Sequence, residues 1–491
     1  DDAIPVWSSD AKHLESLRAE GLKLYLNSVE PDMWQGYSLQ PPLMHFGDKS
    51  ILAAISTESD LPNYSFQLPD KPFVDEDDFH TQHLAVSVRP PLFRPKKLGT
   101  TFFAPFLPEL NDFYRRNATF PGTGVRVEVR GLGIVTEADV STLTVTGFRT
   151  QELISRVFSV FGFKAEISHA GRFATRLIEQ MGGIQGCRVF KIRGVRRLIE
   201  QYSPLKSFTK SAAIQLIRDI NPVTKVSNFG KYESLFIKYR ETPKLTPELV
   251  FNYLAEKDVF RVGLALKCPS CELDFWVPLD DAKTEIQCEY CGNRFNIMPY
   301  LHDRDWAYRR SGLFGRDDHQ QGSIPVALTI QQLETILHGS LRSTIFVGGQ
   351  QIKMMGPPSK ECEVDFVALV QDVHGRIQIA FGECKTGHYG ITAQDVGNLS
   401  VLADAFPRER VQPFIVFSKT SPFTEAEIEL CRKAQGKAWE QRVILLSDRE
   451  LEPYYAYEDA ANEFEVKPSA SSLDMMAMAT QTIYFHPKRR S

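Results

Sequence analysis

The sequence lacks several features that would assign it to a broad class at once. Its 491 residues carry a net charge of -4, so the chain has no overall basic character that would indicate a nucleic-acid-binding protein. No apolar run reaches the roughly 18 to 20 residues needed to span a bilayer. The first residues, Asp-Asp-Ala-Ile-Pro, show no signal-peptide pattern. These absences predict a cytoplasmic protein without a membrane segment, in which any contact with nucleic acid is local.

Two patterns that define other classes are also missing. The Gly-x4-Gly-Lys-Ser/Thr motif of ATP-binding loops does not occur, so an ATP-driven step would need another protein. The eight cysteines do not form a secreted disulfide framework, because four lie in two Cys-x-x-Cys pairs and the others are scattered. The length predicts two to four domains of a folded protein.

The first part of the chain, residues 1–147, is rich in proline and aromatic residues and has few helical periods. His83–Arg89 and Val125–Arg130 alternate between apolar and polar residues, as half-buried strands do. We therefore predict a β-rich domain, and the sequence assigns it no role.

The pattern becomes helical between residues 148 and 266. Thr150 is a candidate N-cap for one helix. Thr246 and Pro247 suit the N-cap and the first position of another, and the strand-like segment Phe260–Leu266 follows it directly. Helix, tight turn and strand in this order predict a winged-helix-like unit that binds DNA or a protein partner.

A basic stretch lies inside this helical region. Between residues 188 and 218, Glu200 is the only acidic residue. A surface of this kind can contact phosphates, and it can equally be an ordinary solvated helical face. The candidates for binding nucleic acid are Arg193, Arg196, Arg197, Lys206 and Lys210.

Two Cys-x-x-Cys pairs predict a zinc site. Cys268 and Cys271 are separated from Cys288 and Cys291 by sixteen residues, which is the spacing of a structural zinc ribbon. A redox Cys-x-x-Cys would explain one pair but not two. Four thiolates close the coordination shell, so the expected role is structural: the ribbon braces its neighbours or adds a finger that faces DNA.

The pattern with the most chemical content lies near the end of the chain. Asp365 sits in an apolar strand, and the next strand ends in Glu383-Cys384-Lys385. Side chains alternate along a strand, so Glu383 and Lys385 share a face. If the two strands pair, Asp365 lies near both. Charged residues at the end of a buried strand are costly without a function.

The elements around this pattern follow a recognisable order. We predict a helix at Val326–Leu337, strands near 343–354, 364–370 and 376–384, a helix at Thr392–Ala405 and a strand at Val411–Phe417, followed by one more helix and strand. With Asp365 and Glu383-x-Lys385, residues 325 to 447 resemble the PD-(D/E)XK, or restriction-endonuclease-like, nuclease superfamily. The proline of the first family motif is absent, and Glu363-Val364 precedes Asp365.

This resemblance implies roles for individual residues. Asp365, Glu383 and the backbone carbonyl of Cys384 would bind Mg²⁺ or Mn²⁺, which offsets the charge of a phosphodiester. Lys385 would orient the attacking water, stabilise the transition state or, with a lowered pKa, act as a base. Three further residues are in positions from which they could join the site: Glu363, Glu334 and Gln394.

The predicted fold class is a multidomain α+β protein with a C-terminal α/β restriction-endonuclease-like domain. The predicted units are a β-rich domain at 1–147, a helical domain at 148–266, a zinc ribbon at 267–300, a linker at 301–324, a nuclease domain at 325–450 and an extension at 451–491, either poorly ordered or docked.

The function that these elements imply together is DNA hydrolysis by a Mg²⁺-dependent endonuclease with structural Zn²⁺, in bacterial restriction or anti-phage defence. One alternative is a scaffold that grips nucleic acid through a non-cleaving nuclease fold. Another is an effector that a protein of the same defence system activates. A homodimer is compatible with the pattern, because nucleases that cut both strands often pair their sites.

Overall fold

The computed structural model describes most of the chain from Thr150 to His486. Before Thr150 it describes Phe148 and the backbone of the strands β1 to β8. The residues after 150 that lie outside the description are 222, 240–243, 302–305, 316–319, 339–343, 356–360, 372–376, 388, 437–440 and 487–491.

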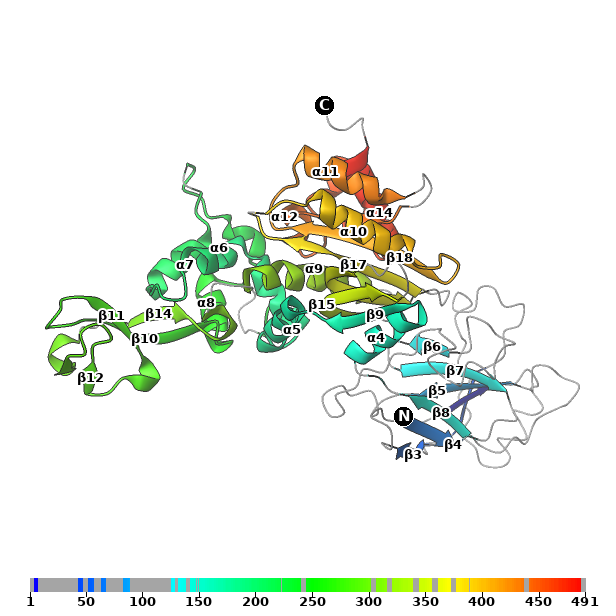
Figure 1. Ribbon diagram of the computed structural model, residues 1–491, viewed down its shortest axis with the longest axis horizontal. Coiled ribbons are helices and arrows are strands. Elements are labelled where there is room, and N and C mark those ends of the chain that lie inside the picture. The colour runs from blue at the N-terminus through cyan, green and yellow to red at the C-terminus, as the bar shows by residue number, and fades with distance from the viewer. Residues whose placement is uncertain are drawn as a thin grey trace, which may run out of the picture.

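A mixed six-stranded sheet forms the centre of the described structure (Figure 1). Its order is β19-β18-β17-β16-β15-β9. The pairs from β9 to β17 are antiparallel, whereas β17, β18 and β19 run parallel. The bounds are β9 Phe163–Ile167, β15 Thr344–Met354, β16 Glu361–Gln371, β17 Ile377–Lys385, β18 Val411–Lys419 and β19 Val443–Leu446.

Helices cover both faces of this sheet, which explains why its strands read as nearly continuous apolar runs. α9 (Gln320–His338) brings Leu328 and Leu333 into the same core as Ala380 of β17. On the other face, α10 (Ala393–Asp404) packs Leu399 into the core that contains Phe381. The predicted order of helix, three strands, helix and strand is confirmed, and α11 (Glu425–Arg432) and β19 follow as expected.

The sheet extends beyond the predicted nuclease domain. β9 pairs with β15, with Ala165 opposite Ile352, although residues 148–266 were predicted as a separate helical unit. α4 (Thr150–Val160) and α5 (His169–Gln180) flank this strand. A Cβ atom on Gly171 of α5 would lie 2.0 Å from the carbonyl oxygen of Gly349, so glycine lets α5 cross β15 closely.

The helical middle of the chain leads into the cysteine-rich segment. It contains α6 (Arg193–Gln201), α7 (Lys210–Arg218) and α8 (Pro247–Glu256), and Thr246 caps α8 by accepting from the Leu249 N–H at 3.2 Å. The strand that follows α8, which was predicted as part of a winged-helix-like unit, belongs to a three-stranded sheet. β10 (Phe260–Lys267) pairs with β11 (Asp274–Pro278) and with β14 (Trp306–Arg310), so the predicted linker contains a strand of this sheet.

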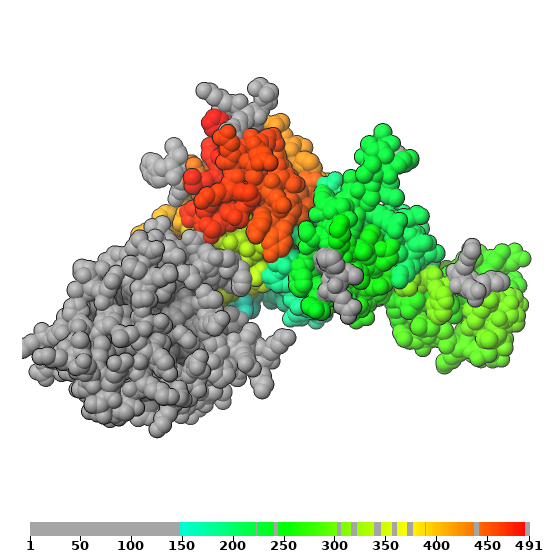
Figure 2. Space-filling model, turned by 180° about the vertical axis from the view of Figure 1, so that it is seen from behind, coloured from blue at the N-terminus to red at the C-terminus, as the bar shows by residue number. Residues whose placement is uncertain are grey.

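The described part of the C-terminal extension, up to His486, is docked, one of the two outcomes expected for it. It contains α13 (Ala461–Phe464) and α14 (Leu473–Thr480), and α12 (Asp448–Leu451) leads into it. The Leu445 N–H of β19 donates to Thr480 Oγ1 at 3.0 Å, and Met476 is fully buried. On the face shown in Figure 2, this orange-to-red segment borders the green helical middle of the chain.

The elements described before residue 147 are strands, and the prediction of a β-rich domain there stays a prediction. The two alternating segments found in the sequence correspond to β5 and β6. No helix within the described residues is long and apolar enough to cross a membrane. The strands are β1 Ile4–Trp7, β2 Leu43–Phe46, β3 Leu52–Ser56, β4 Asn63–Gln67, β5 His83–Val88, β6 Val125–Glu128, β7 Gly131–Glu137 and β8 Thr142–Thr146.

Candidate active site and metal centre

The strands β16 and β17 bring Asp365 to the end of β17. Their backbone register runs from Gln371 opposite Ile377 to Phe366 opposite Gly382. Immediately beyond the last paired residues, Asp365 Oδ2 accepts a hydrogen bond from the Cys384 N–H at 2.7 Å. The carboxylate is therefore fixed by the backbone of the strand that carries the other two predicted residues.

Glycine at position 382 keeps the next strand close to this point. A Cβ atom there would lie 1.9 Å from the Val416 carbonyl oxygen of β18. Any larger residue would push β17 and β18 apart, one residue before the Glu383-x-Lys385 segment.

Glu383 and Lys385 form an ion pair, with Lys385 Nζ 2.5 Å from Glu383 Oε1. Asp395, at the start of α10, lies on the other side of the lysine, with its Oδ2 3.7 Å from Lys385 Nζ. The same Oδ2 accepts the Thr392 N–H at 2.8 Å in the capping box of α10. The three side chains are each about one-fifth exposed, so water and a ligand can reach them.

The carboxylates of this site have raised pKa values. Burial, reinforced by the charge of Glu383, raises the pKa of Asp365 to about 8. Burial and the charges of Asp395 and Glu363 also raise the pKa of Glu383, and Lys385 offsets this only in part. Two half-buried carboxylates that repel each other are a donor set that suits a hard divalent cation.

Lys385 does not have the lowered pKa of a general base. Burial would lower its pKa, but the hydrogen bond to Glu383 and the charges of Glu383 and Asp395 outweigh burial and raise it. This direction favours an ammonium group over a base, and the roles considered for Lys385 stay predictions.

The other predicted residues surround this cluster to different degrees. Glu363 is exposed, and its charge acts on both Asp365 and Glu383. Glu334 on α9 is half-buried and accepts from Gln185 Nε2. Gln394 is exposed in the first turn of α10. A catalytic role for these three residues stays a prediction.

Sequence reasoning missed two features beside the site. Asp395 was overlooked in favour of its neighbour Gln394, although the Thr392-x-x-Asp395 capping pattern marks it as an ordered carboxylate. Below the site, the Cys384 thiol lies 3.5 Å from Thr329 Oγ1, which lies 2.6 Å from Ser418 Oγ. No local sequence signal joins these residues, because they come from α9, β17 and β18.

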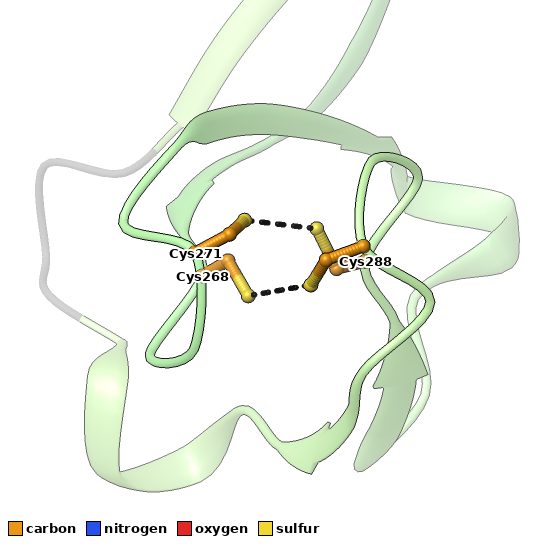
Figure 3. A group of neighbouring side chains, drawn as sticks. Cys268, Cys271 and Cys288 are labelled. Atoms are coloured by element: carbon orange, nitrogen blue, oxygen red, sulfur yellow. Dashed lines mark hydrogen bonds between the residues drawn. The ribbon is translucent and has the colours of Figure 1, made fainter.

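The four cysteines of the two pairs come together in one cluster (Figure 3). Their sulfur atoms all lie within 4.8 Å of one another. Cys268 and Cys291 are 3.7 Å apart, as are Cys271 and Cys288. A tetrahedral site with Zn–S bonds of about 2.3 Å has edges of about 3.8 Å. The cluster can thus hold a structural metal such as zinc.

The two pairs use the same backbone turn. Glu272 follows the first pair and Gly292 the second, both with positive φ, at 58° and 72°. The Glu272 N–H donates to the Cys268 carbonyl at 2.9 Å, and the Gly292 N–H donates to the Cys288 carbonyl at 3.0 Å. β12 (Glu285–Gln287) and β13 (Arg294–Asn296) pair beside the second turn. This repeated geometry aims all four thiols inward.

The ribbon is acidic. Residues 267–300 contain three basic and six acidic side chains, a net charge of -3. A surface of this sign is repelled by phosphates. Of the two roles considered for the ribbon, the charge favours structural bracing over a finger that faces DNA.

The predicted basic surface divides into internal and exposed residues. Arg193 and Arg196 donate to the 3% exposed carboxylate of Glu452, at 2.9 and 2.6 Å. Arg197 pairs with Asp219. Lys206 and Lys210 are exposed, and each lies over an aromatic ring. Arg193 and Arg196 hold the C-terminal segment in place, and nucleic-acid binding by this set stays a prediction.

We expect Glu452→Gln to lower the free energy of unfolding at pH 7 by about 3–5 kcal/mol, because the buried guanidinium of Arg196 loses its charged partner. Besides the two arginines, Lys231 Nζ donates to Glu452 at 2.6 Å. Burial would raise the pKa of Glu452, but the charge of Arg196 and hydrogen bonds from Arg193 and Lys231 lower it to about 2. A carboxyl group whose pKa is depressed in the folded state stabilises the fold at pH values above its ordinary pKa. This stabilisation is lost as the pH falls from the ordinary pKa toward the depressed one.

Chemical denaturation at several pH values tests this prediction. The difference between wild type and Glu452→Gln should be full at pH 6–7 and should shrink as the pH falls from 4.5 toward 2. Glu463→Gln is the matched control, because Glu463 is 63% exposed and pairs only with Arg449 among the described ion pairs. An equal loss of unfolding free energy in the two variants would contradict the proposed contribution of Glu452 to stability.

Comparisons with known proteins do not assign the chain to a family. No family model matches it, and no curated protein matches it significantly. One similar structure is the protein VC1899 from Vibrio cholerae, with 12% identity and a TM-score of 0.28. Another is Can2 from Sulfobacillus thermosulfidooxidans in complex with cyclic tetra-adenylate, with 12% identity and a TM-score of 0.25.

Both of these matches are partial. Each covers 61% of this chain, and they cover 58% and 59% of the two solved chains respectively. The chain therefore spans less than two thirds of either protein. Likeness at these TM-scores assigns neither a fold nor an activity, and membership of the PD-(D/E)XK superfamily remains a proposal.

Proposed function

We propose that the protein is a metal-dependent nuclease that hydrolyses phosphodiester bonds in DNA. One observation carries the proposal: Asp365, Glu383 and Lys385 converge at the end of a buried strand, and the pKa values of both carboxylates are raised. Perturbed carboxylates beside a fixed ammonium group are expected at a catalytic site. The element order around them supports the resemblance to the PD-(D/E)XK superfamily.

The residues present fit a divalent cation. Asp365 and Glu383 would hold Mg²⁺ or Mn²⁺, with the backbone carbonyl of Cys384 as a third oxygen ligand. When bound, the cation would neutralise the anionic phosphodiester and promote the ionisation of water. The chain prepares the site by fixing Asp365 on the Cys384 N–H, at 2.7 Å, before any ligand arrives.

Lys385 would supply positive charge to the reacting phosphate. Its ammonium group is held by Glu383 and steadied by Asp395, which is itself fixed in the helix cap. A preorganised charge costs no reorganisation when negative charge builds up in the transition state. Asp395 is thus a positioning residue for Lys385.

A substrate panel tests this function and its setting. The full chain should cleave plasmid or linear DNA with Mg²⁺ or Mn²⁺ and leave it intact in EDTA, with single-stranded DNA and RNA as parallel substrates. Cleavage of RNA alone would contradict the DNA assignment. Tight binding without cleavage under any of these conditions would identify a non-cleaving scaffold, and cleavage only after adding a partner would identify a regulated effector.

A role in restriction or anti-phage defence is part of the proposal and rests on the layout of the chain.

A further inference from the structure

Arg188 is a buried arginine whose charge is not fully matched. It lies in the 3-10 segment η3 (Ile184–Lys191) and is 9% exposed. Its Nε atom is buried and has no hydrogen-bond partner in the part of the chain that the structure describes. A buried guanidinium with an unused donor is costly, so this arrangement suggests a missing anion.

The charges around Arg188 make the mismatch larger. Lys191, one turn away, is fully buried, and after burial the charge of Arg188 is the largest cause that lowers its pKa. Lys191 Nζ is satisfied by Gln332 and by the carbonyls of Leu451 and Pro453, at 3.0 and 2.8 Å. Glu452, the nearby buried carboxylate, is occupied by Arg193, Arg196 and Lys231. Among the described residues, Arg188 is therefore left without an ion pair of its own.

Two exposed tyrosines lie next to this arginine. The guanidinium carbon of Arg188 is 5.2 Å from the ring centroid of Tyr454, which is 39% exposed. Tyr455 is 42% exposed, and its ring meets that of Tyr454 edge-to-face at 4.9 Å. Arginine together with exposed aromatic rings is the combination that holds a phosphate and stacks a base in single-stranded nucleic acids.

We propose that Arg188, Tyr454 and Tyr455 form a subsite for one nucleotide of a nucleic-acid strand, with Arg188 on its phosphate and a tyrosine ring against its base. The phosphate would pair with the guanidinium group of Arg188, and its charge would relieve the repulsion between Arg188 and Lys191. The subsite lies between η3 and the segment after β19, outside the Asp365–Lys385 cluster. It deepens the proposed function, since it rests on a nucleic-acid substrate.

Glu458 is the group that opposes binding there. Its carboxylate lies 3.5 Å from the Tyr455 N–H, and its charge also acts on Lys191. The subsite therefore predicts opposite effects for two changes: Arg188→Met weakens binding of the strand, and Glu458→Gln strengthens it. A purely structural arginine would produce no such pair of effects.

Fluorescence anisotropy with a labelled single-stranded DNA oligonucleotide, measured on the full chain in EDTA, tests the subsite without cleavage. We expect Arg188→Met to weaken binding about 10- to 100-fold, as for the loss of a charge-assisted hydrogen bond. The magnitude of the slope of log binding constant against log salt concentration should decrease by about 0.7, because the variant neutralises one phosphate fewer. The melting temperature should stay equal or rise, because an uncompensated buried charge is removed.

The controls separate this inference from its rivals. Arg432→Met removes an exposed arginine paired with Glu429 and should leave binding unchanged. AMP as a competitor distinguishes a free nucleotide: if only AMP binding depends on Arg188, the assignment to a strand is overturned. Wild-type binding by Arg188→Met, or a loss of stability without a specific loss of binding, overturns the subsite. If the oligonucleotide binds through Arg188 but no substrate is cleaved, the proposed nuclease function is refuted and the subsite stands.

Discussion

Lys385→Ala is expected to lower kcat for DNA cleavage by about 10²- to 10³-fold, the cost of removing one preorganised group that stabilises transition-state charge. The effect should appear in kcat and kcat/KM together, with KM little changed, because the ammonium group acts on charge that develops during the reaction. Steady-state cleavage of a labelled duplex at saturating Mg²⁺ measures both constants.

A nearby lysine provides the matched control for this variant. Lys353 is exposed on β15, in the same sheet, and Lys353→Ala should cleave like wild type. A rise in KM alone for Lys385→Ala would mean that the lysine only binds substrate. Unchanged kinetics would remove Lys385 from the site.

Cys288→Ser is the second change with a large expected effect. Structural zinc contributes an apparent binding free energy of about 10–16 kcal/mol in small zinc modules, so the loss of one buried thiolate should leave the ribbon without metal and locally unfolded. Cys288 is 2% exposed and faces the other three thiols. Elemental analysis should find one zinc per wild-type chain and none in the variant, and limited proteolysis should cut near residues 268–300 only in the variant.

Cys362→Ser tests whether this loss is specific. Cys362 is half-buried on β16 and does not belong to the four-cysteine cluster. Its variant should keep one zinc and resist the protease as wild type does. A wild-type chain that contains no zinc and keeps a protease-resistant ribbon would contradict the metal centre.

The C-terminal helices and strands and the two candidate sites could be predicted from the sequence because the sequence patterns that indicate them are local. β16, β17 and β18 are apolar runs long enough to be recognised as strands, and the hairpin pairing of β16 with β17 follows from their order along the chain. The position of Asp365 next to Glu383 and Lys385 then follows from strand geometry alone. The cysteine spacing similarly fixes the cluster without any knowledge of the surrounding fold.

Apart from Asp395, which a local capping pattern marks, the missed features depend on residues that are far apart in the chain. β9 completes the sheet by pairing with β15, nearly two hundred residues later, and nothing in Phe163–Ile167 names that partner. Arg193 and Arg196 looked like a free basic surface because Glu452, which binds them, lies more than 250 residues away. Pairing of this kind is decided by tertiary packing rather than by local composition.

The most direct test of the central claim is the metal dependence of DNA cleavage in wild type and in Asp365→Asn, prepared in parallel. Asparagine keeps the size of the side chain but removes the charge that would hold the cation. We predict a saturable rise of the wild-type rate with Mn²⁺, no cleavage in EDTA and no detectable cleavage by Asp365→Asn at any Mn²⁺ concentration. Equal cleavage by both proteins, or cleavage that persists in EDTA, would contradict a nuclease site built from Asp365, Glu383 and Lys385.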